Sequence, residues 1–156
     1  MVKWCFVLAT VMVAAGNEKA AKPNLNGTWE LDVSKSDFGD MPPPKSVVNV
    51  IVHKEPFITV DSTMVVPQGK FSATLKYRTT AAQDANSSYG AAMTTWSKWF
   101  GNEFVIEGEI VVKGKWVRFQ ERWSLSNRGT MLTNKRVIIM PNREVPQTLV
   151  FIKKGK

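Results

Sequence analysis

Apolar and polar side chains alternate along most of the chain from residue 27 onward, and this pattern restricts the chain to a β fold. Successive residues of a strand point to opposite faces of a sheet, so the alternation marks strands with one buried face. Gly, Pro, Asn and Asp interrupt it about every ten residues, as in sandwiches and barrels. No window of about a dozen residues combines helical periodicity with helix caps. We therefore expect an all-β fold, an antiparallel up-and-down barrel of about 8–10 strands.

Nine segments carry the strand pattern: 27–33, 46–54, 57–65, 70–80, 94–100, 103–112, 115–125, 130–140 and 147–154. Residues 81–93 are small and polar, and we interpret them as a long connection, either a lid at the mouth of the barrel or a surface loop. The turn Lys113-Gly114 predicts a hairpin that places Glu109 opposite Arg118 and Glu107 opposite Gln120. The two glutamates then become exposed cross-strand partners of Arg118 and Arg122, which argues against a catalytic carboxylate pair.

One charge falls on the inward face of the predicted sheet. Glu121 lies between Phe119 and Trp123, and the next strand carries Asn134 and Arg136 on the same face. An unpaired inward carboxylate costs several kcal/mol, so Glu121 needs a partner, and Arg136 is within reach. Two interpretations stay open: a buried ion pair that fixes the strand register, or a polar anchor for a ligand in a cavity.

The N-terminus has the layout of a secretory signal peptide. Lys3 precedes an apolar run over residues 4–15 that is too short to span a bilayer, and Gly16 ends it. We divide the chain into a signal peptide (1–16), a polar leader (17–24) and one domain (25–156), and expect a secreted or periplasmic product. Cys5 is the only cysteine and leaves with the signal peptide. No later segment is a transmembrane candidate.

The formal net charge of +8 makes an anionic membrane surface a candidate partner. The basic residues are spread along the chain and do not interleave with the tryptophans on one face, which argues against nucleic acid. Asn26 and Asn86 begin N-glycosylation sequons, which matter only in a eukaryotic secretory pathway.

No catalytic or metal-binding set can be assembled from the sequence. His53 is the only histidine, and a lone histidine is a poor metal site. The calcium-loop-like residues 84–90 lack the required glycine and glutamate. We therefore expect no metal, no cofactor and no enzymatic activity. An acid–base mechanism centred on Glu121 and Tyr77 is the one enzymatic alternative.

Three segments carry a resemblance to known families. Gly27-x-Trp29 on the first strand, followed by antiparallel strands in order, resembles the lipocalin and fatty-acid-binding superfamily. "GTWELDVSKSDFGDMPPPKS", "SKWFGNEFVIEG" and "ERWSLSNRGTMLT" are similar to small secreted bacterial proteins with a lipocalin-like domain and no established activity. The resemblance implies that Trp29 closes one end of the barrel and that Lys153 packs across it.

We expect the domain to bind a small apolar or amphiphilic molecule outside the cytoplasm. Apolar walls would come from Phe71, Leu75, Tyr77, Phe104, Ile106, Phe119, Trp123 and Leu132, while Glu121, Arg136 and Asn134 would orient the ligand. The alternative is a barrel filled by its own side chains that acts as an interaction module against an anionic envelope surface or a protein partner.

Overall fold

The computed structural model describes residues 20–155, so the predicted signal peptide and Cys5 lie outside the described residues. Ten strands form one antiparallel sheet, in the order β4-β3-β2-β1-β10-β9-β8-β7-β6-β5. They are β1 Gly27–Leu31, β2 Ser46–Lys54, β3 Phe57–Val66, β4 Gly69–Arg78, β5 Thr80–Ser88, β6 Ala91–Phe100, β7 Glu103–Val112, β8 Lys115–Ser126, β9 Met131–Met140 and β10 Arg143–Lys153. Two short 3₁₀ turns, η1 Val33–Lys35 and η2 Asn127–Gly129, lie between strands. The all-β, up-and-down prediction is confirmed.

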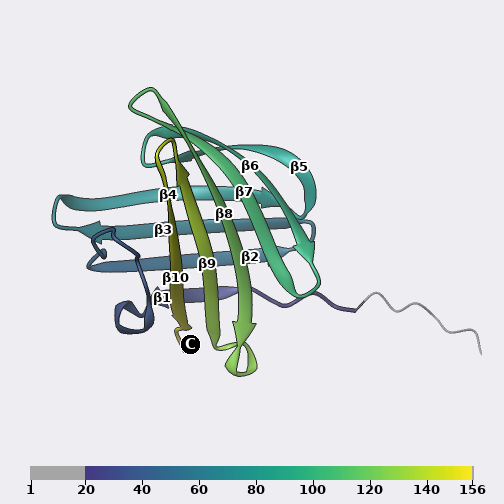
Figure 1. The fold of residues 1–156 in the computed structure, drawn as a ribbon. Coiled ribbons are helices and arrows are strands. Elements are labelled where there is room, and N and C mark those ends of the chain that lie inside the picture. Colours follow the sequence, from purple (N-terminus) through teal and green to yellow (C-terminus); the bar gives the residue numbers. More distant parts are fainter. Residues whose placement is uncertain (1–19, 156) are drawn as a thin grey trace, which may run out of the picture.

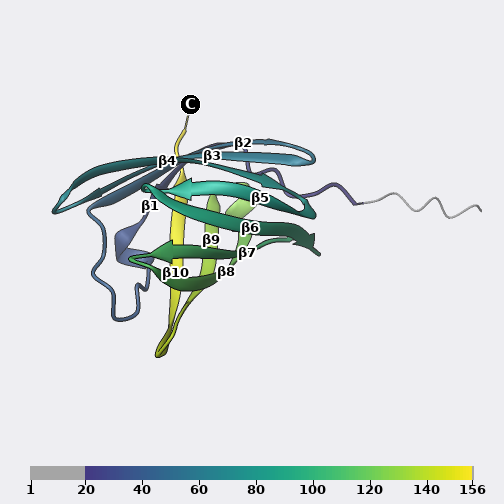
Figure 2. The ribbon, with the colours of Figure 1, turned by 90° about the horizontal axis from the view of Figure 1, so that it is seen from above.

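The sheet folds over on itself, so that β1 to β4 cross β7 to β10 (Figure 1). Seen from above, the two sets form two layers (Figure 2). Neighbouring strands run in opposite directions, so the turns gather at two ends. One end, which we call the closed end because buried side chains fill it, carries the turns at 55–56, 79, 101–102 and 127–130. The other end, which we call the open end because a cavity reaches it, carries the turns at 67–68, 89–90, 113–114 and 141–142 and the connection 32–45.

Residues 81–93 are not a loop, and here the prediction was wrong. Most of them form β5, a two-residue turn at Tyr89 and Gly90, and the start of β6. The strand escaped detection because the side chains on its inward face are small or polar, not apolar. The predicted final strand also began too late, because β10 pairs with β9 from Arg143 onward in spite of Pro146.

The two strands at the margins of the sheet, β4 and β5, approach each other without a backbone ladder between them. Side chains of β5 bridge this β4–β5 seam. The Asn86 side chain accepts a hydrogen bond from the Lys76 N–H (2.8 Å) and donates one to the Lys76 carbonyl (2.9 Å). Asp84 accepts a hydrogen bond from the Arg78 N–H at 2.9 Å. Side-chain groups therefore replace the missing ladder.

The predicted register of the β7–β8 hairpin is confirmed. Glu109 lies opposite Arg118 and Glu107 opposite Gln120, with an Arg118–Glu109 ion pair at 3.2 Å. The partner proposed for Arg122 was wrong, because its guanidinium contacts Glu103 at 3.0 Å. Gly108 sits beneath the ring of Phe119, where a Cβ atom would lie 2.2 Å from a ring carbon. This bare position lets the aromatic ring lie flat against the sheet.

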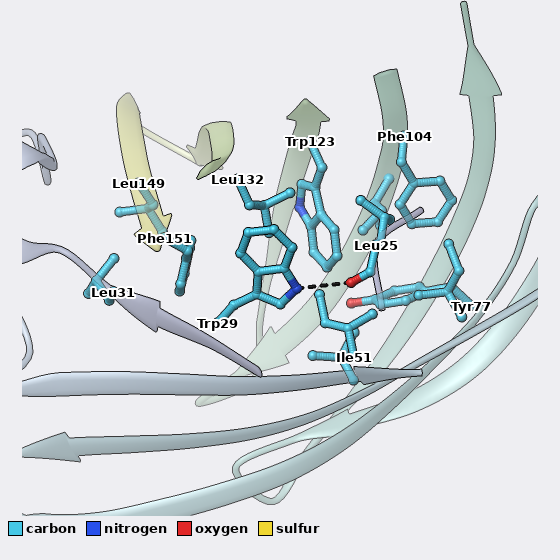
Figure 3. Close-up of a cluster of buried hydrophobic side chains, with 13 residues drawn as sticks. Leu25, Trp29, Leu31, Ile51, Tyr77, Phe104, Trp123, Leu132, Leu149 and Phe151 are labelled. Carbon is cyan, nitrogen blue, oxygen red and sulfur yellow. Dashed lines mark hydrogen bonds between the residues drawn. The ribbon is translucent and has the colours of Figure 1, made fainter. Parts of the chain in front are cut away.

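Trp29 lies in the closed-end core with a side chain that is 0% exposed. Its indole N–H donates to the Leu25 carbonyl at 2.9 Å, and its ring is surrounded by apolar side chains (Figure 3). The Lys153 ammonium lies 5.2 Å from the ring centroid, as the resemblance implied. Gly27 has a φ of 138°, and a Cβ there would meet the Lys153 chain at 2.5 Å, so this position requires glycine. Trp29 thus closes the barrel.

Candidate functional site

A cavity of about 1350 Å³ occupies the open half of the barrel, above the closed-end core. Its walls come from both layers and are mostly apolar, including Leu31, Val47, Val60, Met64, Leu75, Leu149 and Phe151. Ligand pockets in proteins typically measure about 300–1,000 Å³, so this volume accommodates a small organic molecule. The lining extends to Tyr89, Lys113, Trp116 and Pro141 in or beside the turns of the open end. The cavity therefore reaches the surface at that end.

The predicted site residues separate into three groups by depth. Glu121, Arg136, Asn134, Tyr77, Leu75, Phe119 and Trp123 line the cavity. Phe71 is exposed at the rim, with its ring 5.9 Å from that of Tyr89. Phe104, Ile106 and Leu132 are buried in the closed-end core. Strand alternation identifies the inward face of each strand, but it does not tell how far along the barrel axis a side chain lies. That is why these four residues were grouped with the cavity walls.

Other lining residues were not predicted as part of the site. Gln147, Asn49 and Ser62 add polar groups, and the connection 32–45 contributes Phe38, Met41, Pro42 and Pro44. Asn49 and Ser62 follow from strand parity alone, since each lies on the inward face of its strand. Gln147 was the first residue of the predicted final strand (147–154), but no inward face was assigned to that strand. Nothing in the alternation pattern pointed to the proline segment.

Glu121 is the centre of a polar cluster within the apolar walls. It lies directly opposite Arg136 on the neighbouring strand, where the strand pattern allowed a direct or a diagonal neighbour. One carboxylate oxygen, Oε2, accepts hydrogen bonds from the Trp123 indole at 2.8 Å and the Asn134 amide at 2.9 Å. The other, Oε1, lies 3.7 Å from Arg136 Nη1. The inward carboxylate is thus stabilised by two short hydrogen bonds and one longer ion pair.

Arg136 extends this cluster to β10 and the β1–β2 connection. Its Nε donates to Gln147 Oε1 at 2.9 Å, and the Gln147 amide donates to the Phe38 carbonyl at 2.9 Å. The connection is also tied to β10 by backbone hydrogen bonds between Asp37 and Thr148. The connection therefore lies along the side of the barrel, and its proline segment contributes to the cavity wall.

Tyr77 lies beside the cluster with its ring packed against Phe104 and Trp123. Burial, and then the charge of Glu121, raise the pKa of its phenol well above the ordinary value of 10.0. The phenol therefore stays protonated at neutral pH, where it is a poor proton donor or acceptor for catalysis. The described hydrogen bonds include none between Tyr77 and Glu121.

Several other predicted features can be placed. His53 makes a hydrogen bond with Glu55 at 2.9 Å and accepts one from the Leu25 N–H at 3.3 Å, so it is a structural histidine. Both sequon side chains form hydrogen bonds with backbone groups. Asn86 bridges the β4–β5 seam, and Asn26 is bonded to the main chain of His53 at 2.9 and 2.7 Å.

Within residues 20–155, no three His, Cys, Asp or Glu side chains form a metal-binding group. No helix in that range has the length and hydropathy to cross a membrane.

Comparisons with known proteins agree on the fold. No family model matches the chain, and no curated protein matches it either. Among solved structures, it is similar to the zebrafish ileal bile acid-binding protein complexed with cholic acid, at 14% identity and a TM-score of 0.58, with 83% of this chain and 98% of the other covered. A secretory abundant heat soluble protein from Ramazzottius varieornatus gives 11% identity and a TM-score of 0.60, with coverage of 83% and 94%.

A fatty-acid-binding protein from Manduca sexta gives 12% identity and a TM-score of 0.50, with coverage of 83% and 99%. At such identities the likeness extends to the fold alone. The chain is thus a nearly closed, ten-stranded antiparallel barrel of the calycin or lipocalin-like fold.

Proposed function

We propose that the protein binds a small apolar or amphiphilic molecule, reversibly and non-covalently, within this cavity. The observation that carries the proposal is a large apolar space with one polar cluster at its wall. Burial of an apolar body supplies affinity at about 25 cal/mol per Å² removed from water, and a few polar groups fix the orientation. The similar structures support this, since one holds cholic acid and another is named for binding fatty acids.

A cavity-filling pair of variants tests the proposal. Ser62 lines the cavity, whereas Ser72 faces outward on the adjacent strand. We expect the fluorescence of the neutral dye Nile red to rise on titration with the native protein and with Ser72→Trp, and to show weaker binding with Ser62→Trp. Native mass spectrometry after solvent extraction would then identify a natural ligand. If the native protein leaves the dye dark, or if both variants bind it equally, the proposal fails.

We also infer that binding takes place outside the cytoplasm, in a secreted or periplasmic protein. The support is the signal-peptide layout of residues 1–16, which lie outside the described residues. Expression of the full chain in a bacterial host tests this. N-terminal sequencing of the protein from the periplasm or the medium should begin near Asn17. Recovery of the protein in the cytoplasm with Met1 intact would contradict the inference.

A second candidate function, contact with an anionic membrane, is favoured by the rim of the open end. Trp116 is 61% exposed there, Tyr89 and Val112 are exposed nearby, and Lys113 and Lys115 flank the β7–β8 turn. Aromatic and basic side chains together suit a surface of anionic lipids. The open cavity argues against the filled-barrel form of this idea.

Vesicle sedimentation tests the membrane proposal. Binding to vesicles with anionic phosphatidylglycerol should exceed binding to neutral phosphatidylcholine, fall with added salt, and weaken in the Lys113→Glu and Lys115→Glu double variant. A double variant with the same change in charge on the outer face of the barrel, Lys76→Glu with Lys98→Glu, should have less effect. Equal binding to neutral vesicles, or none to either kind, would rule the proposal out.

A further inference from the structure

We propose that the polar end of the ligand is an uncharged group that both donates and accepts hydrogen bonds, such as a hydroxyl, and that it sits between Glu121 and Arg136. The inference rests on the proposed function and deepens it. It names the class of amphiphile that the cavity accepts and the class that it rejects.

The first observation is that the polar cluster is already neutral. Glu121 and Arg136 are the two charged side chains that line the depth of the cavity, and their side chains are 12% and 29% exposed. The other charged lining residues, Lys113, Lys115 and Arg143, lie at the turns of the open end. A charged ligand head would therefore enter a site that offers no net opposite charge.

The second observation is the pattern of unused hydrogen-bonding atoms. Among the described residues, Glu121 Oε1 has no donor closer than Arg136 Nη1 at 3.7 Å, which is too long for a hydrogen bond. A hydroxyl oxygen about 2.8 Å from each atom would donate to Oε1 and accept from Nη1. A carboxylate would accept from Arg136, but it would bring a second negative charge against Glu121. An ammonium would meet the converse repulsion from Arg136.

The third observation comes from two asparagines of the lining. Asn134 is 5% exposed, and its amide nitrogen is committed to Glu121, which fixes its oxygen as an acceptor. That oxygen and the side-chain oxygen of Asn49 are buried without a hydrogen-bond donor among the described residues. Both oxygens are closed off from the cavity, so the part that Asn134 takes here is to hold the Glu121 carboxylate. A ligand carboxylate would have to meet the negative charge that is held there.

Three probes that share one chain length and differ only in the head group test the inference. Decanol, decanoate and decylammonium would each compete with Nile red at neutral pH. We expect decanol to bind about tenfold or more tightly than either charged probe. Glu121→Gln removes the negative charge, so it should raise the affinity for decanoate and reduce the preference for decanol. Glu109→Gln, at an outer-face ion pair with Arg118, should leave the preference unchanged.

The double variant Glu121→Gln with Arg136→Gln tells whether the net charge of the cluster or the change of side chain at Glu121 sets the preference. It keeps the cluster neutral, so the preference for decanol should persist there although it shrinks in the single variant. Circular dichroism would verify that each variant is folded. If Nile red binds but decanoate competes as well as decanol, the inference is overturned while the proposed function stands. If neither the dye nor any probe binds, the proposed function itself fails.

Discussion

The two ends of this barrel are built by the same strands, yet they differ in almost every physical respect. At the closed end, Trp29 and Phe104 are fully buried and the chain before β1 packs across the opening through Leu25. At the open end, Trp116 is exposed, and the connection 32–45 is bonded to β10 through Asp37 and lines part of the cavity. Strand alternation decides which side chains face inward, while the segments at each end decide whether the interior is filled.

This difference separates stability from binding along the barrel axis. Large buried side chains at the closed end supply the burial energy, whereas the walls of the open half surround a cavity. Substitutions at the closed end should therefore affect folding, and substitutions at the open end should affect ligand binding. The following experiments test this division, from the largest expected effect to the smallest.

The largest effect should come from the two tryptophans. Trp29→Ala removes a fully buried ring and its hydrogen bond to Leu25, so we expect a loss of about 3–5 kcal/mol in the free energy of unfolding. Trp116→Ala at the exposed rim should change it by less than about 0.5 kcal/mol. Urea denaturation followed by far-ultraviolet circular dichroism measures both. Similar losses for the two variants would break the division.

The next largest effect should come from replacing a serine by tryptophan, once in the buried region and once in the cavity. Ser97 is buried near Ile106, and its hydroxyl donates to the Arg78 carbonyl at 2.9 Å. Ser97→Trp should overpack this region and cost at least about 1–3 kcal/mol. Ser62→Trp places the same ring in the cavity and should cost much less. Thermal denaturation ranks the two variants, and a larger loss for Ser62→Trp would contradict a cavity at that position.

The third experiment concerns the β4–β5 seam, which runs between the two ends of the barrel. It tests whether side-chain hydrogen bonds hold these two strands together. Asn86→Ala removes both side-chain bonds to Lys76 and should cost about 1–2 kcal/mol. Hydrogen exchange at the Lys76 amide should accelerate more than exchange at the β7–β8 ladder. Ser87→Ala, on the exposed face of the same strand, is the control. Unchanged exchange at Lys76 would show that Asn86 does not hold the seam.

The smallest effect is a pH dependence at the closed end. Partial burial raises the pKa of Glu55, but hydrogen bonds from Thr79, His53 and Trp99 outweigh it and hold the pKa below the ordinary 4.5. A lowered pKa in the folded state means that the carboxylate stabilises the fold above 4.5 and that this contribution is lost as the pH falls below that value.

The free energy of unfolding of Glu55→Gln should therefore lie below that of the native protein at neutral pH. The difference between the two proteins should shrink as the solution is acidified below 4.5. Urea denaturation at a series of pH values measures it, with Glu107→Gln on the exposed outer face as the matched control. A difference that grows on acidification would reverse the assigned sign.

The pairing of Glu121 with Arg136 could be predicted from the sequence, but their depth along the barrel axis could not. Alternation and one turn signal placed Glu121 and Arg136 on the same face as direct or diagonal neighbours, because a one-residue shift would move every side chain to the other face, and the structure makes them direct neighbours. The same signals missed β5, whose inward face carries Asp84 and Asn86 for the seam. Phe104 and Phe119 both face inward, and only the three-dimensional tilt of the strands separates the core residue from the cavity wall.

Strand β10 is the last of the ten strands along the chain, although it lies in the middle of the sheet between β1 and β9. Until it is in place, β1 and β9 each present an unpaired edge, which invites association with other chains. Gln147, Leu149 and Phe151 of this strand also form part of the cavity wall. Pairing of β1 with β10 joins opposite ends of the chain, and such distant contacts form slowly. Docking of β10 therefore completes the cavity wall and covers the edges of β1 and β9 in the same step of folding.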